Sequence, residues 1–142
     1  MPPNELVALL HRYMAAFDRG DYDTLVQFYC DDVVLVIANG AELHGKQAIV
    51  DFYRAATAKT RRTIKIVQAL AQNALIAAEL ESEFLALGDY PDFTSGPMRK
   101  GDRLYLNTLV LYELRDAAFS RIRSAPLKRE WRRIEDEERA AQ

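Results

Sequence analysis

Apolar residues recur at intervals of three and four in two stretches of the N-terminal part of the chain. This spacing predicts an amphipathic helix over residues 4–19, ended by Gly20, and a later helix over residues 46–59. Asp21 is a suitable N-cap for a shorter helix between them. The first stripe consists of Leu6, Leu9, Leu10, Tyr13 and Phe17, and the last of Ile49, Phe52, Tyr53 and Ala56.

The pattern then changes to one that is typical of strands. Residues 33–38 are apolar and largely β-branched, and they precede Asn39-Gly40, a dipeptide that favours a tight hairpin turn. Residues 74–87 contain good helix formers, but their three glutamates occupy every second position, and this alternation favours a strand. Further strands are predicted over residues 63–71, 104–114 and 119–125.

Prolines and charged residues mark the remaining segments. Residues 88–102 are rich in turn formers and are expected to form a long surface loop, either a lid over a ligand or a simply anchored connection. Pro126 is expected to end the sheet. In the tail, Leu127, Trp131 and Ile134 have helical spacing, which predicts a C-terminal helix docked by its tryptophan.

Taken in order, these elements predict an α+β fold. Three N-terminal helices interleaved with a short hairpin are followed by a meander of strands, and a strongly curved mixed or antiparallel sheet would wrap around the helices as a cone. Residues 1–126 are expected to form the domain, and residues 127–142 a charged helical extension of it.

Composition narrows the function classes. The 19 Lys and Arg residues against 21 Asp and Glu give a net charge of −2, which argues against a nucleic-acid or anionic-membrane footprint. A single cysteine excludes an intramolecular disulfide, and one cysteine with two histidines cannot build an ordinary closed Cys/His zinc site. Neither a metal nor a cofactor is expected. The N-terminus lacks a basic and apolar leader, and no apolar run is long enough to span a membrane, so a cytoplasmic protein is expected.

A series of residues in the N-terminal half matches the pattern of a known superfamily. The residues are Arg12-Tyr13, Ala15-Ala16, Gly20-Asp21-Tyr22-Asp23, Asp31-Asp32, Gly40, Gly45, Ile49 and Phe52-Tyr53. In these residues the chain resembles the NTF2-like superfamily, in particular its SnoaL-like and ketosteroid-isomerase-like members, and the resemblance covers residues 4–125. It implies a pocket at the mouth of the cone, between the helices and the concave sheet, and a homodimer formed through the outer sheet face.

Ketosteroid isomerase chemistry requires a carboxylate base and two acidic hydroxyls that hydrogen-bond a developing enolate. The resemblance implies that Tyr13 takes the place of the family's oxyanion tyrosine. The family's base falls on Ile37, and its second oxyanion acid falls on Val110 or Leu111. Because none of these three can donate or accept a proton, ketosteroid isomerisation by that mechanism is not expected.

Pocket candidates follow from the inward stripes and the central strands. Tyr13 is the expected hydrogen-bond donor, and Glu81 is the candidate base. Asn107 is one candidate to orient a carbonyl or water, and Thr108 and Tyr112 take its place if the strand register shifts by one. The predicted ligand-binding residues are Phe17, Phe28, Ile37, His44, Phe52, Tyr53, Asn107 and Tyr112.

The glutamate trio Glu79, Glu81 and Glu83 has two interpretations. It lies either on a solvated outer face or inside the cone, where burial would raise the pKa of Glu81 and an arginine such as Arg121 or Arg123 would accompany it. Apolar residues flank both faces of this strand, so the pattern leaves the choice open.

Two function classes remain. The first is a pocket protein for a small, largely apolar molecule, either an enzyme using general acid/base catalysis without a metal or a relative that only binds. The second is a non-catalytic interaction module that uses the outer sheet and the Trp131 helix. An enclosed cavity of about 300 Å³ or more that contains a perturbed carboxylate would favour an enzyme. An epoxide hydrolase or dehydratase is less expected, because histidines are few and the late strands offer little inward Asp.

Overall fold

The computed structural model describes residues 1–37 and 39–141. Its helices are α1 (Pro3–Asp18), α2 (Tyr22–Leu25), the 3₁₀ turn η1 (Val26–Phe28), α3 (Lys46–Ala58) and α4 (Ile134–Ala140). Its strands are β1 (Tyr29–Val36), β2 (Glu42–His44), β3 (Thr60–Gln72), β4 (Leu75–Ala86), β5 (Arg103–Arg115) and β6 (Ala118–Arg132). Ala38, included in the first predicted strand, lies outside the described residues.

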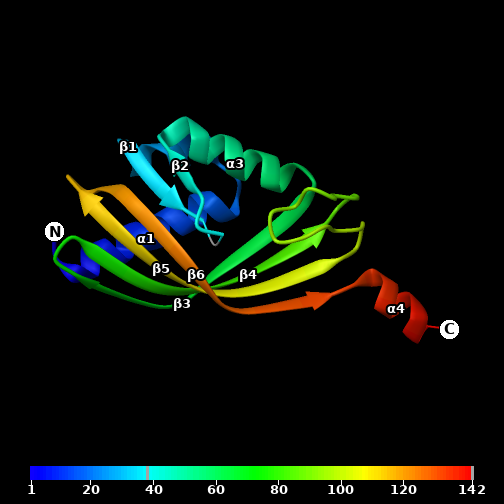
Figure 1. The fold of residues 1–142 in the computed structure, drawn as a ribbon. Helices are drawn as coiled ribbons and strands as arrows, with labels where there is room; N and C mark the ends of the chain where they lie inside the picture. The colour runs from blue at the N-terminus through cyan, green and yellow to red at the C-terminus, as the bar shows by residue number, and fades with distance from the viewer. Residues whose placement is uncertain (38, 142) are drawn as a thin grey trace.

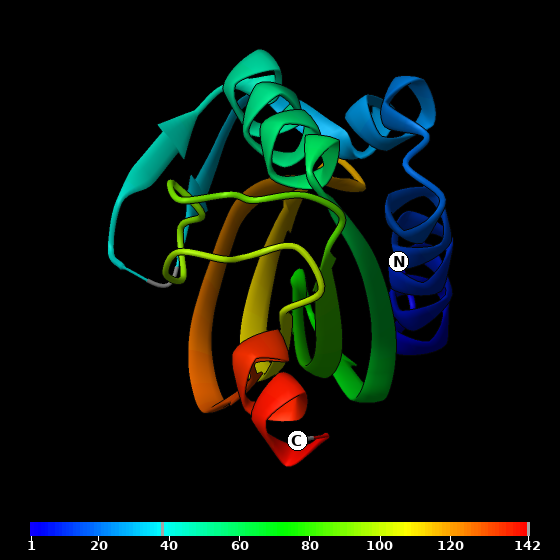
Figure 2. The ribbon, with the colours of Figure 1, turned by 90° about the vertical axis from the view of Figure 1, so that its right-hand side faces the viewer.

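The six strands form one mixed sheet in the order β2-β1-β6-β5-β4-β3. Strand β1 runs parallel to β6, and all other neighbours are antiparallel. Figures 1 and 2 show a strongly curved sheet with α1 and α3 on its concave side and α4 beyond the end of β6. The predicted α+β cone is therefore present.

Helix α1 and the concave sheet face share the main core. The predicted stripe of α1 is buried, and Leu10 is fully buried within it. On β4 the even-numbered residues from Ile76 to Ala86 are buried, so this row faces the helices. Burying a side chain the size of leucine contributes about 1.5–3 kcal/mol, so this contact stabilises the cone.

A second, smaller core anchors the loop between β4 and β5. A backbone bridge joins Tyr90 to Met98, and the loop folds back toward α3 (Figure 2). Phe93 and Met98 are buried against the ends of the long strands. The loop is thus anchored, and Phe93 also forms part of a cavity wall. The cluster contains Phe84, Ala86, Phe93, Met98 and Leu104, with Tyr90, Leu106 and Trp131 against it.

The C-terminal segment corrects the prediction that Pro126 ends the sheet. Strand β6 continues to Arg132, and α4 begins only at Ile134, so Trp131 lies on a strand instead of a helix. Pro126 pairs with Thr108 beside a register irregularity. A bulge of this kind tolerates a residue without a backbone N–H, which explains why the proline interrupts the ladder without ending it.

Candidate functional site

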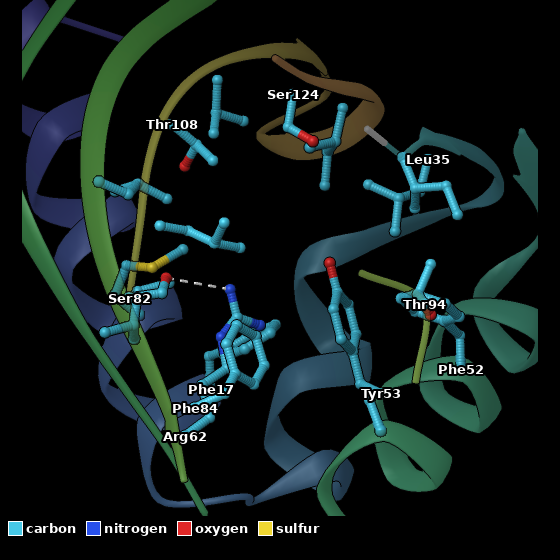
Figure 3. Close-up of a pocket in the computed structure, with 18 of the residues that line it drawn as sticks. Phe17, Leu35, Phe52, Tyr53, Arg62, Ser82, Phe84, Thr94, Thr108 and Ser124 are labelled. Atoms are coloured by element: carbon cyan, nitrogen blue, oxygen red, sulfur yellow. Dashed lines mark hydrogen bonds between the residues drawn. The ribbon is translucent and has the colours of Figure 1, made fainter. Parts of the chain in front are cut away.

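A cavity of about 150 Å³ lies between the concave sheet, α1, α3 and the β4–β5 loop (Figure 3). Its wall is largely apolar. The apolar part consists of Met14, Phe17, Leu35, Ile37, Phe52, Ala56, Ile64, Leu80, Phe84, Phe93, Leu106, Val110 and Ile122. The polar part consists of Tyr13, Tyr53, Arg62, Ser82, Thr94, Ser95, Thr108, Tyr112 and Ser124.

Hydroxyl groups reach this cavity from several elements. Figure 3 shows the Tyr53 hydroxyl pointing from α3 into the space enclosed by Ser82, Thr108 and Ser124. These last three come from β4, β5 and β6, where each occupies an inward position of its strand. Burial raises the pKa of Tyr53, although nearby Arg62 opposes this rise. Tyr53 is therefore a neutral hydroxyl at physiological pH.

Tyr13 lies deeper in the wall and has a partner. Its hydroxyl is 2.6 Å from the hydroxyl of Tyr29, and both side chains are buried. Burial is the main cause that raises the pKa of Tyr13, and Tyr29 raises it further. The two phenols form a neutral pair in which either can donate to the other.

Arg62 is the cation of the cavity wall. It sits near the start of β3 and pairs with Phe84, a position that faces inward. Its Nη2 donates to Ser82 Oγ at 3.4 Å, and its guanidinium lies 4.5 Å from the ring centroid of Phe17. Arg62 is not among the residues predicted from the sequence to line a pocket. The signal was present, because Arg62 falls in period-two phase with Ile64 and Ile66.

The wall residues that the structure describes include no aspartate, glutamate or histidine. The cavity can therefore donate hydrogen bonds to an oxygen that carries negative charge, but its side chains supply no ordinary base for proton abstraction. It also falls below the roughly 300 Å³ typical of enzyme and ligand pockets. The criterion set for an enzyme, a larger cavity with a perturbed carboxylate, is not met.

Most of the predicted pocket residues reach the wall, and the exceptions have local reasons. Phe28 packs in the core on Tyr13, with the ring centroids 5.5 Å apart. His44 lies exposed on β2, where its Nε2 is 3.2 Å from Glu42 Oε1. The cavity wall does include Tyr13, Phe17, Ile37, Phe52, Tyr53 and Tyr112.

The interpretation that places Glu81 inside the cone is wrong. Glu81 is exposed and pairs with Asn107 across the ladder, and both belong to the odd-numbered rows on the outer face. Asn107 Nδ2 donates to Glu79 Oε2 at 2.9 Å, so this amide is satisfied outside the cavity. The helices cover the opposite face, which brings Thr108 to the wall instead.

The accompanying arginines lie on the outer face too. Arg121 and Arg123 both approach Glu113 at 4.0 Å, between arginine Nε and the carboxylate Oε2. These are exposed ion pairs of small energetic weight.

Apolar side chains occupy the two positions that the resemblance assigns to acid/base groups. Ile37 lines the cavity where a base was implied. Val110 lines it where an oxyanion acid was implied, while Leu111 is exposed on the outer face. The cavity wall therefore has an apolar side chain both where the resemblance implies a base and where it implies a second oxyanion acid.

Within residues 1–37 and 39–141, no three His, Cys, Asp or Glu side chains gather closely enough to hold a metal ion. Of the helices in this part of the chain, none is long and apolar enough to cross a membrane.

Solved structures share this architecture. A protein of Xanthomonas campestris pv. campestris assigned as a polyketide cyclase has a TM-score of 0.75 and 21% identity, covering 86% of this chain and 90% of that one. An LEH-like epoxide hydrolase of M. tuberculosis has a TM-score of 0.70 and 16% identity, covering 87% and 84%. A protein of Kribbella flavida assigned as a ketosteroid isomerase has a TM-score of 0.66 and 12% identity, covering 89% and 80%.

At these identities the structural likeness shows the fold alone. A search of curated protein sequences finds no match. The family model of the SnoaL-like domain, in contrast, matches residues 10–122, which is most of the chain. The chain therefore belongs to the SnoaL-like domain family, with an NTF2-like fold.

Proposed function

We propose that this protein binds a small, largely apolar molecule in the cavity between the helices and the concave sheet. The observation that carries this proposal is the make-up of the wall, in which aromatic and aliphatic side chains surround a few convergent hydroxyls and one guanidinium. Such a wall favours an apolar body with a polar end, because the apolar area supplies affinity and the polar groups set orientation.

Binding without turnover is the form of this function that the wall favours. A proton transfer at carbon needs a side chain that accepts the proton within hydrogen-bond reach. The wall offers hydroxyls and Arg62, which act as donors at neutral pH, and its described residues include no carboxylate or imidazole. The activities named for the structural neighbours are therefore not carried over to this chain.

Native mass spectrometry of the purified protein tests the proposal. We expect a bound small molecule, or one that binds on incubation with small apolar compounds. Thr108→Phe fills the cavity from β5 and should abolish binding. Leu109→Phe places the same side chain at the next residue of β5, which faces outward, and should leave binding intact. Binding that survives Thr108→Phe and is lost with Leu109→Phe would refute this location.

We further propose that a second copy of this chain covers the outer sheet face. Leu70 is 74% exposed on β3 and Leu109 is 46% exposed on β5, an unusual display of leucine on a sheet. Carboxylates and guanidinium groups on the same face, at Glu113 and Arg123, supply both signs of charge. Such a face is self-complementary about a twofold axis, since each acidic group can meet a basic group of the other copy.

Light scattering after size-exclusion chromatography tests this second proposal. The wild-type chain should have the mass of a dimer, and Leu109→Glu should convert it to a monomer because the interface would then bury a carboxylate on each copy. Leu87→Glu is the matched control, since Leu87 is 52% exposed and lies beyond the end of β4. A monomeric wild-type protein would refute the dimer.

A further inference from the structure

The polar contacts of Arg62 leave most of its donors unused. Its Nε is fully buried and has no hydrogen-bond partner among the described residues. Among the described residues, Arg62 makes one side-chain hydrogen bond, from Nη2 to Ser82 Oγ at a long 3.4 Å. A guanidinium carries five N–H donors in a fixed plane, and leaving such donors buried and unpaired is costly.

Aromatic rings fix the orientation of this guanidinium. Its central carbon lies 4.5 Å from the ring centroid of Phe17, 5.0 Å from that of Phe84 and 5.9 Å from that of Tyr53. Cation–π contacts of this kind hold the charge without satisfying its N–H groups. Figure 3 shows the guanidinium extending toward Ser82 at the cavity, with the Tyr53 ring beside it.

The charge of Arg62 is also unbalanced. Several other arginines of the chain pair with carboxylates, as Arg103 does with Glu83 and Arg115 with Asp32. The wall around Arg62 has no acidic residue in the described part of the chain. Burial lowers the pKa of the guanidinium. A buried cation in this state is stabilised by an anion that enters the cavity.

Hydroxyls complete a site of the right chemistry next to the cation. Tyr53 points its hydroxyl into the same cavity, and no hydrogen bond from it to another described residue is found. Ser82 Oγ accepts from Arg62, so its own proton remains free to donate. One guanidinium and two neutral hydroxyl donors match the two oxygens of a carboxylate, which accept several hydrogen bonds.

Resting on the proposed binding function, we infer that the ligand is a small monocarboxylate whose two oxygens are held by Arg62, Ser82 and Tyr53. Its apolar body then lies against the aromatic and aliphatic wall. The cavity of about 150 Å³ limits that body to a single ring, since an engineered cavity of about 150 Å³ accepts benzene.

Binding of three compounds that share one ring tests this inference. Benzoate, benzamide and toluene are titrated by calorimetry or protein-observed NMR at pH 7 and constant ionic strength. The wild-type protein should bind benzoate at least tenfold more tightly than benzamide, its neutral isostere. Arg62→Met should remove this preference while toluene still binds, and Arg62→Lys should retain part of it. Arg61→Met changes the adjacent exposed arginine and should leave the preference intact.

The outcomes separate the two proposals. If toluene and benzamide bind and benzoate has no advantage, the carboxylate site is refuted and the apolar cavity stands. An advantage that persists in Arg62→Met, with thermal melting confirming a folded variant, also refutes it. If Arg62→Met does not fold, the inference rests on the other two proteins. It stands if wild type prefers benzoate to benzamide at least tenfold and Arg62→Lys retains part of this preference, and it is refuted if wild type shows no preference. If no compound binds to the wild-type protein, the proposed function fails together with this inference.

Discussion

Asp102 ties the loop beside the cavity to the C-terminal segment, and replacing it with asparagine tests how the fold holds this wall. Its side chain is almost fully buried. Oδ2 accepts from the Arg99 amide at 2.8 Å and from Arg133 Nη1 at 2.9 Å, and Oδ1 accepts from the Ile134 amide at 2.9 Å. Asp102→Asn keeps the shape of the side chain and removes its charge.

The size of the effect follows from these three contacts. Asparagine has one oxygen, so its NH₂ group must face at least one donor that the carboxylate now accepts. Hydrogen bonds to charged groups contribute about 1.5–3 kcal/mol each, and a buried donor left unpaired adds a further cost. We expect a loss of about 3 kcal/mol in the free energy of unfolding. At about 3 °C per kcal/mol for a chain of this size, Tm should fall by about 9 °C.

The effect should depend on pH in a defined direction. Burial acts to raise the pKa of Asp102, but the amides of Arg99 and Ile134 and the Arg133 guanidinium outweigh it and hold this pKa below its ordinary value. A lowered pKa in the folded state stabilises the protein above the unfolded value of about 3.9, and this contribution is lost as the pH falls through the folded pKa. The gap between wild type and variant should therefore be largest near neutrality.

Urea denaturation at pH 7 and at about pH 3 measures the loss in unfolding free energy and its dependence on pH. The lower pH lies below the pKa of aspartate in the unfolded chain. Asp92→Asn is the matched control, because Asp92 is exposed in the same loop and should change stability by less than about 0.5 kcal/mol. Equal stability of wild type and Asp102→Asn at pH 7 would refute the reasoning. So would a difference that stays constant on acidification.

Two further predictions concern single positions. Tyr13→Phe should cost about 1–2 kcal/mol of unfolding free energy in urea denaturation, because the buried Tyr29 hydroxyl loses its partner. Its control is Tyr112→Phe, which removes a hydroxyl with no hydrogen bond to the described residues and should cost less. Gly101→Ala should lower Tm by several degrees, because Gly101 has φ +93° and the added Cβ would lie 3.2 Å from Ile134, the first residue of α4. In the control Gly88→Ala, the added Cβ meets open space, and Tm should hardly change.

Local periodicity predicted most elements of the fold. The stripe of α1 extends over the buried face of the helix, and the alternation of glutamates correctly indicated that β4 is a strand despite its helix-forming composition. Pro126 misled the prediction, because a proline is compatible with a sheet where a bulge removes the need for its N–H. Whether a bulge forms depends on the partner strand, which local sequence does not describe.

The site was predictable where helices supply it and unpredictable where the sheet does. Tyr13, Phe17 and Tyr53 lie on the apolar stripes of α1 and α3, so their inward direction follows from helical spacing. On β4, in contrast, leucines and alanines flank both rows, and the pattern could not show that Glu81 faces outward. The inward position of Arg62 was not predicted, because a charged residue at the start of a strand is usually solvated.

By itself, then, the sequence determined the order and type of most elements, the family, and the apolar residues at the implied acid/base positions, Ile37 and either Val110 or Leu111. These depend on residue identity and on spacing within a segment. Only the tertiary structure decided which sheet face the helices cover, and hence that Thr108 enters the cavity and Asn107 does not. The physical reason is that an alternating strand with apolar residues on both faces gains burial energy on whichever side is covered, and distant segments choose that side.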